Sequence, residues 1–76
     1  MNRLEACASG FIGNICSVKG DSRFQSRMVS VGLLPGSKIE MLLNQKRRPL
    51  LLYCRNTVLA LNREDGKNIL VEEVSR

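Results

Sequence analysis

Three cysteines are the residues of this chain best suited to hold a metal ion or to react, and their spacing argues against both roles. The chain has 76 residues and no histidine, the commonest general base and metal ligand. Cys7, Cys16 and Cys54 are scattered, without the close pairs that a four-ligand zinc site uses. We therefore predict no metal site and no cofactor, and we interpret the two cysteines of predicted strands, Cys16 and Cys54, as small apolar residues.

Catalysis of other kinds lacks the necessary partner groups. A serine, cysteine or lysine nucleophile needs a neighbouring group that activates it, and the sequence indicates none. Its glycines do not form a phosphate-binding loop, because no lysine follows them at the required place. The sequence thus predicts a protein that is not an enzyme and that acts through its surface.

Positive charge is concentrated in one segment of the chain. The formal net charge is +5, and no acidic residue occurs between Glu40 and Glu64. Such an asymmetry indicates which partners a protein attracts, and it carries no information about the fold. The whole excess of positive charge lies in this segment, on Lys46, Arg47, Arg48, Arg55 and Arg63.

The basic run at residues 46–48 has two interpretations. It is a solvated hairpin tip, or it docks on an acidic protein surface or on anionic headgroups at the inner membrane face, where each nearby basic residue contributes about 1 kcal/mol. Nucleic acid is a disfavoured partner, because the chain has only three aromatic residues on which bases could stack.

An apolar stretch, Leu-Leu-Leu-Tyr at residues 50–53, follows the basic run. If Leu50 and Leu52 point into the core, Leu51 and Tyr53 point outward, since side chains alternate along a strand. Apolar side chains beside a charged rim indicate an interface; the alternative is a strand buried on both faces. The candidate partner-binding residues are therefore Lys46, Arg47, Arg48, Leu51 and Tyr53.

A helix is predicted at about residues 22–31. Phe24, Met28 and Val31 fall on one helix face, and we expect all three to lie in the core. A helix of ten residues is too short to be stable alone, so it must pack on a sheet.

A sharp corner follows this helix. Gly32 suits the left-handed position just past the carboxyl end, where Leu33 can fold back on Met28. Pro35 and Gly36 fit the two central positions of a type II turn. We interpret these five residues as a structural corner that sets the angle between the helix and the next strand.

The remaining segments alternate in hydropathy or form short apolar runs, as strands do. Residues 62–66 read as a short helix or turn, and Gly13 indicates a bulge in the first strand. About five strands and one helix in a single domain predict a mainly β fold, a small antiparallel barrel with the helix over one open end. The predicted strands lie at 11–19, 38–43, 50–55, 57–61 and around 69–71.

The same segments resemble the FeoA family, ferrous iron transport protein A, over nearly the whole chain. The stretch RMVSVGLLPGSKIEML at residues 27–42 is similar to the family signature, in which a helix ends in Met-Gly-Leu and Pro-Gly leads into a strand. Other matches follow in the same order: Leu4, Gly10, Ile15, Val18, Gly20, the segment NTVLALNRED, Ile69 and Val71. The sequence departs from the family in the QKRR loop and at Val31, Asn56 and Gly66, where methionine, glycine and alanine are usual.

This resemblance implies an SH3-like barrel without catalysis of its own, in the cytoplasm or at the inner face of the membrane. It implies one FeoA-like domain over residues 1–76 that regulates ferrous iron uptake by protein–protein contact with the cytosolic part of the FeoB transporter. Two alternatives stay open. One is a free-standing regulatory module like the SH3-like domain of metal-dependent repressors, which would bind a DNA-binding partner or its own copies. The other is a small basic nucleic-acid binder.

Overall fold

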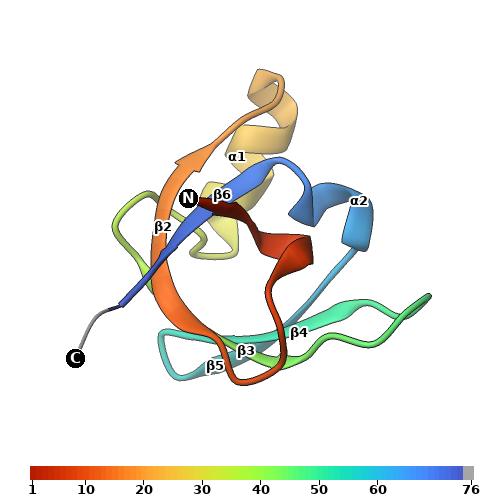
Figure 1. The fold of residues 1–76 in the computed structure, drawn as a ribbon. Coiled ribbons are helices and arrows are strands. Elements are labelled where there is room, and N and C mark those ends of the chain that lie inside the picture. Colours follow the sequence, from red (N-terminus) through yellow and green to blue (C-terminus); the bar gives the residue numbers. More distant parts are fainter. Residues whose placement is uncertain (75–76) are drawn as a thin grey trace.

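The computed structural model describes residues 1–74, and the fold is mainly β, as predicted (Figure 1). No helix within these residues is long and apolar enough to cross a membrane. The elements in chain order are β1 (Asn2–Arg3), the 3-10 turn η1 (Leu4–Ala6), β2 (Ile12–Val18), α1 (Ser22–Ser30), β3 (Lys38–Leu43), β4 (Leu50–Cys54), β5 (Thr57–Leu61), α2 (Arg63–Gly66) and β6 (Ile69–Glu73).

The six strands of the described residues form one antiparallel sheet in the order β1-β6-β2-β3-β4-β5. The sheet curls through the long, bent strand β2, so that β6 and β1 lie opposite β3, β4 and β5, and α1 lies at one end of the curl (Figure 1). This arrangement agrees with the predicted barrel and its capping helix. The strand beyond the expected five is β1, whose two residues are too few to show an alternating pattern.

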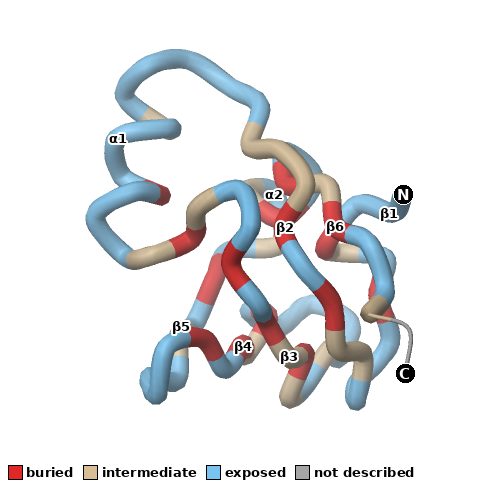
Figure 2. Tube along the Cα trace, turned by 90° about the vertical axis from the view of Figure 1, so that its left-hand side faces the viewer, coloured by how far each residue is buried: buried red, intermediate tan, exposed pale blue. Residues whose placement is uncertain are grey.

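The interior of the curled sheet is filled by aliphatic, methionine and cysteine side chains. In Figure 2 buried positions alternate with exposed ones along the strands, as the pleat requires. Burying one such side chain fully stabilises the fold by about 1.5–3 kcal/mol. The buried apolar residues are Leu4, Cys7, Ile15, Met28, Leu33, Ile39, Met41, Leu50, Leu52, Cys54, Leu61, Ile69 and Val71.

The irregularity of β2 lies three residues from the place predicted for it. The register of β2 against β6 shifts between Ile15 and Ser17, which makes Cys16 the extra residue. Gly13 instead pairs regularly with both neighbouring strands. It is a glycine for a different reason: a Cβ atom there would collide with the backbone carbonyl oxygen of Glu72. The prediction of a bulge at Gly13 was therefore wrong, because close strand approach produces the same sequence signal.

Helix α1 begins where the carboxylate of Asp21 accepts a hydrogen bond from the backbone N–H of Phe24, at 2.9 Å. Met28 is buried and Phe24 is partly buried, but Val31 is 44% exposed. The prediction that Val31 lies in the core was wrong. The helix ends at Ser30 and Val31 is the capping residue, with φ −93° and ψ 0°; its side chain lines an open groove between α1 and β5 instead of the core.

The corner after α1 begins with a Schellman motif. The N–H of Leu33 donates to the carbonyl of Met28 at 2.9 Å, and the N–H of Gly32 donates to the carbonyl of Val29 at 3.0 Å. Gly32 has φ 90°, the left-handed conformation that this motif needs. Leu33 and Met28 are both buried in the same core cluster, as the sequence predicted.

A type II turn completes the corner. The N–H of Ser37 donates to the carbonyl of Leu34 at 2.9 Å, and Gly36 has φ 91° at the third turn position. The turn is also joined to β2: Gly36 donates to the carbonyl of Ile15 at 2.7 Å, and Ile15 donates to the carbonyl of Ser37 at 2.9 Å. These bonds fix the direction in which β3 leaves the corner.

Candidate interaction surface

The outward side chains of β4, β5 and the end of β3 form an apolar strip, which we call the outer face. The inward residues of β4 are buried, so the alternate residues Leu51 and Tyr53 point away from the core. Three of the strip's residues are large and exposed: Leu43 at 44%, Tyr53 at 40% and Val58 at 59%. The outer face consists of Leu43, Leu51, Tyr53, Val58 and Ala60.

Strand pairing holds these residues side by side. Leu51 of β4 pairs with Leu43 on one side and with Ala60 on the other, and Tyr53 pairs with Val58. Side chains in such cross-strand pairs contact each other directly. The outer face is therefore continuous across three strands, although its residues are spread over eighteen positions of the sequence.

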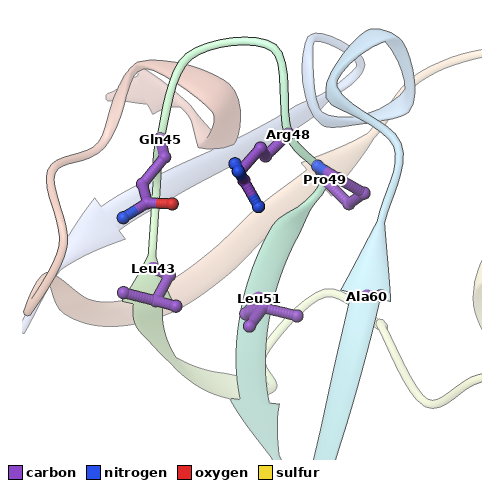
Figure 3. Close-up of a pocket in the computed structure, with 6 residues that line it drawn as sticks. All are labelled: Leu43, Gln45, Arg48, Pro49, Leu51 and Ala60. Atoms are coloured by element: carbon purple, nitrogen blue, oxygen red, sulfur yellow. The ribbon is translucent and has the colours of Figure 1, made fainter.

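A hollow of about 200 Å³ opens at one end of the outer face (Figure 3). Leu43, Leu51 and Ala60 form its apolar floor, while Gln45, Arg48 and Pro49 stand over it from the loop between β3 and β4. The side chain of Arg48 lies over the gap between the two arms of this loop. The hollow therefore combines an apolar floor with a cation at its rim.

The loop carries the basic run that the sequence singled out. Lys46, Arg47 and Arg48 are exposed at its tip, which extends beyond the barrel (Figure 1). The N–H of Arg48 donates to the carbonyl of Gln45 at 3.2 Å, and Arg47 has φ 65°. Of the five candidate partner-binding residues, the structure brings Arg48 and Leu51 into one hollow and places Tyr53 one outward position further along β4. Lys46 and Arg47 do not line that hollow.

Arg63, a residue that the sequence did not single out for a role, braces the base of this loop. Its Nη1 donates to Asn44 Oδ1 at 2.7 Å and to the carbonyls of Gln45 and Arg48 at 3.0 and 3.4 Å. The amide of Asn44 in turn donates to the carbonyls of Glu5 and Cys7. No periodic pattern could have indicated these contacts, because they join three segments that are distant in the sequence.

The outward residues of β5 were also missed, although a signal was present. Thr57, Leu59 and Leu61 share one parity of that strand, and assigning them to the inner face makes Val58 and Ala60 outward. The five corner residues, from Met28 to Gly36, line no part of the hollow. They lie at the end of α1 and in the turn that joins α1 to β3.

The cysteines lie apart in space as well as in sequence. Cys7 and Cys54 are buried, and Cys16 is half-buried at the bulge. Cys16 Sγ lies 3.6 Å from Glu72 Oε2; loss of hydration, the hydrogen bond to Glu72 and the charge of that carboxylate raise the pKa of the thiol. Loss of hydration and the charge of Glu5 likewise raise the pKa of Cys7. Within residues 1–74, no group of three or more histidine, cysteine, aspartate or glutamate side chains lies close enough together to hold a metal ion.

The model of the FeoA domain matches residues 2–73. No curated protein sequence matches the chain significantly.

Several solved structures share this fold. The crystal structure of an iron uptake regulatory protein, FeoA, superposes with a TM-score of 0.92 at 20% identity, over 96% of this chain and 97% of that one. FeoA of Stenotrophomonas maltophilia, complexed with zinc and described as a prokaryotic SH3 domain protein, gives 0.80 at 19% identity, over 95% of this chain and 91% of that one. These likenesses confirm the predicted SH3-like fold.

A repressor domain has the same fold. A manganese-dependent transcriptional repressor superposes with a TM-score of 0.89 at 17% identity. The match covers 96% of this chain but only 41% of the repressor. The likeness therefore concerns one part of that protein, and at this identity it shows the fold alone.

Proposed function

The chain belongs to the FeoA domain family, and on this premise we propose that it is a non-catalytic accessory protein that regulates ferrous iron uptake by binding the cytosolic part of a FeoB-type transporter. Membership of the family makes it a protein associated with iron transport. The contact with the transporter and the absence of catalysis are our inference. We further propose that residues 1–76 act as one FeoA-like domain in the cytoplasm, close to the inner membrane face.

The observation that carries this proposal is the hollow at the end of the outer face. Contiguous exposed apolar surface, unlike single exposed apolar side chains, is typical of interaction sites. The floor formed by Leu43, Leu51 and Ala60 suits an apolar side chain of the partner, and Arg48 suits a carboxylate beside it. An aromatic or aliphatic anchor in a pocket with a charged rim is the usual centre of a protein–protein interface.

The basic loop tip suits the same partner. Lys46 and Arg47 lie beyond the hollow and increase the rate of encounter with an acidic surface, because exposed charges steer association. Anionic headgroups near the transporter would be attracted by the same charges. We expect the apolar floor to provide most of the affinity and the loop to provide most of the salt dependence.

A pull-down with the cytosolic domain of the transporter tests the proposal. We expect recovery to fall strongly in the triple variant Lys46→Glu, Arg47→Glu, Arg48→Glu and in the single variant Leu51→Asp. The matched control is Arg3→Glu, Lys19→Glu, Arg23→Glu, which reverses three exposed charges away from the loop and should bind as the wild type does.

Equal recovery of wild type and the loop variant would remove the loop from the interface. Equal recovery of wild type and Leu51→Asp, with the fold verified by circular dichroism, would remove the hollow. If the wild-type protein is not retained by the transporter domain at all, the proposed contact itself is wrong.

A second candidate function is a free-standing regulatory module that binds a DNA-binding protein or its own copies. The fold shared with a manganese-dependent repressor favours it. Co-elution with a repressor instead of the transporter would decide for this alternative. Direct binding of nucleic acid is the third candidate, and it would show a steep loss of affinity with added salt.

A further inference from the structure

The free side of β5 is an unpaired sheet edge. β5 is the last strand of the sheet and pairs only with β4. Arg55 and Asn56, the two residues of the turn between these strands, have φ 53° and 62°, so the residues that flank the turn form a hydrogen-bonded pair. Because such pairs alternate along the ladder, the amides and carbonyls of Val58 and Ala60 point away from β4. Within residues 1–74 they take part in no other backbone hydrogen bond.

A groove of about 320 Å³ runs along this edge, between β5 and α1. Met28 and Val31 line it from the helix, and Leu59 lines it from the strand. An ion pair between Arg27 of α1 and Asp65 of α2, 2.6 Å long, lies at one end. The exposed side chain of Val31, which the helical pattern assigned to the core, thus belongs to the wall of a groove that is apolar over much of its length.

One end of the β5 edge is basic. Arg47 and Arg48 border Ala60 near the end of the strand in a neighbouring depression. No acidic residue occurs in the sequence between Glu40 and Glu64, the segment that includes β4 and β5. A ligand on this edge would therefore meet positive charge at this end.

We propose that the β5 edge binds an extended acidic segment of a partner protein as an added strand. The backbone of the segment pairs with Val58 and Ala60, alternate apolar side chains enter the groove, and a carboxylate at one end meets Arg47 and Arg48. Unpaired edges bind peptides in this way in other proteins. This surface adjoins the hollow of the outer face, with which it shares Arg48 and Ala60, and the proposal does not depend on the identity of the transporter.

A second copy of this chain is a poorer occupant of the same edge. No acidic residue occurs between Glu40 and Glu64, so β5 of a second copy offers no carboxylate to Arg47 and Arg48. The charge pattern therefore favours an acidic partner over self-pairing.

Titration with a defined peptide tests this inference. The probe is acetyl-Glu-Glu-Val-Thr-Val-Glu-Glu-amide, and the comparison peptide has lysine in place of each glutamate. In nuclear magnetic resonance spectra of the isotopically labelled protein, we expect the amide signals of Val58 and Ala60 to shift and to become protected from hydrogen exchange. The lysine peptide should bind at least about tenfold more weakly, a difference of about 1.4 kcal/mol.

Two protein variants separate backbone pairing from side-chain contact. Ala60→Pro removes an N–H that points to the free edge, a place where strands tolerate proline, and should lower the affinity at least about tenfold. Thr57→Ser, at a β5 position whose amide faces β4, should bind as the wild type does. If Ala60→Pro fails to fold, probe peptides N-methylated either at the threonine or at both valines replace it: one of the two should lose binding, because only one set of amides faces β5.

Three results would overturn the proposal. One is absence of binding by the wild-type protein. Another is binding in which the signals of Leu43 and Leu51 shift while the amides of Val58 and Ala60 remain unprotected. The third is a concentration-dependent shift of Val58 and Ala60 without peptide, which would assign the edge to a second copy of the chain.

Discussion

At the scale of single residues, Arg63 has a structural role that its sequence context did not indicate. Its guanidinium lies within hydrogen-bond distance of the side-chain oxygen of Asn44 and of the carbonyls of Gln45 and Arg48, the first and last residues of the turn in the basic loop. Hydrogen bonds from a charged donor each stabilise by about 1.5–3 kcal/mol. Because the guanidinium of Arg63 is hydrogen-bonded to these oxygens, Arg63 stabilises the conformation of the loop more than it adds to the positive charge that a partner would meet.

We predict that Arg63→Ala lowers the free energy of unfolding by about 1–3 kcal/mol and increases the mobility of residues 44–48. Urea unfolding measures the first effect and amide relaxation measures the second. Arg23→Ala is the control, since Arg23 makes no ion pair within residues 1–74. Equal stability of the two variants would contradict the bracing role.

At the same scale, we predict how the reactivity of the Cys16 thiol depends on pH. Loss of hydration and the neighbouring carboxylate of Glu72 raise the pKa of its thiol, so at neutral pH the folded protein holds less thiolate than a free cysteine would. Glu72→Gln removes a negative charge and should lower that pKa, which raises the thiolate fraction at any pH below it.

The rate of alkylation by iodoacetamide, followed by mass spectrometry at several pH values, measures this change. We expect Cys16 to react faster in Glu72→Gln than in the wild type, with the pH profile moved to lower pH. Glu73→Gln is the matched control, because its side chain points to the other face of β6. The same profile in both variants would show that the carboxylate of Glu72 does not influence the thiol.

At the scale of elements, the corner between α1 and β3 depends on two glycines in the left-handed region. A Cβ atom at Gly36 would meet nothing within 4 Å, so a side chain there is opposed only by the backbone conformation, φ 91°. We predict that Gly36→Ala lowers the free energy of unfolding by about 1–2 kcal/mol.

Gly36→Asn should be less destabilising than Gly36→Ala, because asparagine adopts the left-handed region more readily. Thermal unfolding followed by circular dichroism compares the two. If alanine and asparagine are equally destabilising, or if alanine is neutral, the turn is not limited by this dihedral angle.

Two apolar side chains of helix α1 lie in different surroundings. Met28 attaches it to the core, whereas Val31 at its end lines the groove beside β5. Periodicity alone placed both residues in one buried stripe, because it assumes that the helix continues to the last apolar position. The Schellman motif ends the helix earlier and turns Val31 outward.

At the scale of the whole molecule, the described residues place charge and apolar surface on one half of the barrel. The outer face, its hollow, the basic loop and the β5 edge are all built from β3, β4 and β5. Outside the segment between Glu40 and Glu64, the chain carries equal numbers of acidic and basic residues, and this part forms β1, β2, β6 and α1. We infer that the half formed by β3, β4 and β5, together with the end of α1 that lines the groove beside β5, meets partners, and that the remaining elements complete the barrel.

Metal provides a test at this scale, since a structure with the same fold was solved with zinc. The described residues bring no three potential ligands together. We predict that neither zinc nor a chelator changes the melting temperature of this protein beyond measurement error. A ligand at one hundred times its dissociation constant would add about 2.7 kcal/mol, so a clear rise in melting temperature with zinc would reveal a site that the scattered cysteines did not predict.

The sequence by itself determined five of the six strands of the described residues, the helix α1 and the corner after it. Alternation marks which residues of a strand are buried, and left-handed glycines and a proline define turns over four or five residues, so this information is local. It indicated that Leu51 and Tyr53 could face outward, and it located the basic run. It also carried the family resemblance, which the family model confirms.

Only the tertiary structure decided what lies beside these residues. Gly66 illustrates the difference: helix propensity favours alanine there by about 1 kcal/mol, yet a Cβ atom would lie 2.7 Å from Leu50 Cδ1. The hollow, the Arg63 brace and the free edge of β5 likewise depend on segments that meet only when the sheet curls. Contacts between distant segments follow from strand order and register, and no short stretch of sequence contains either.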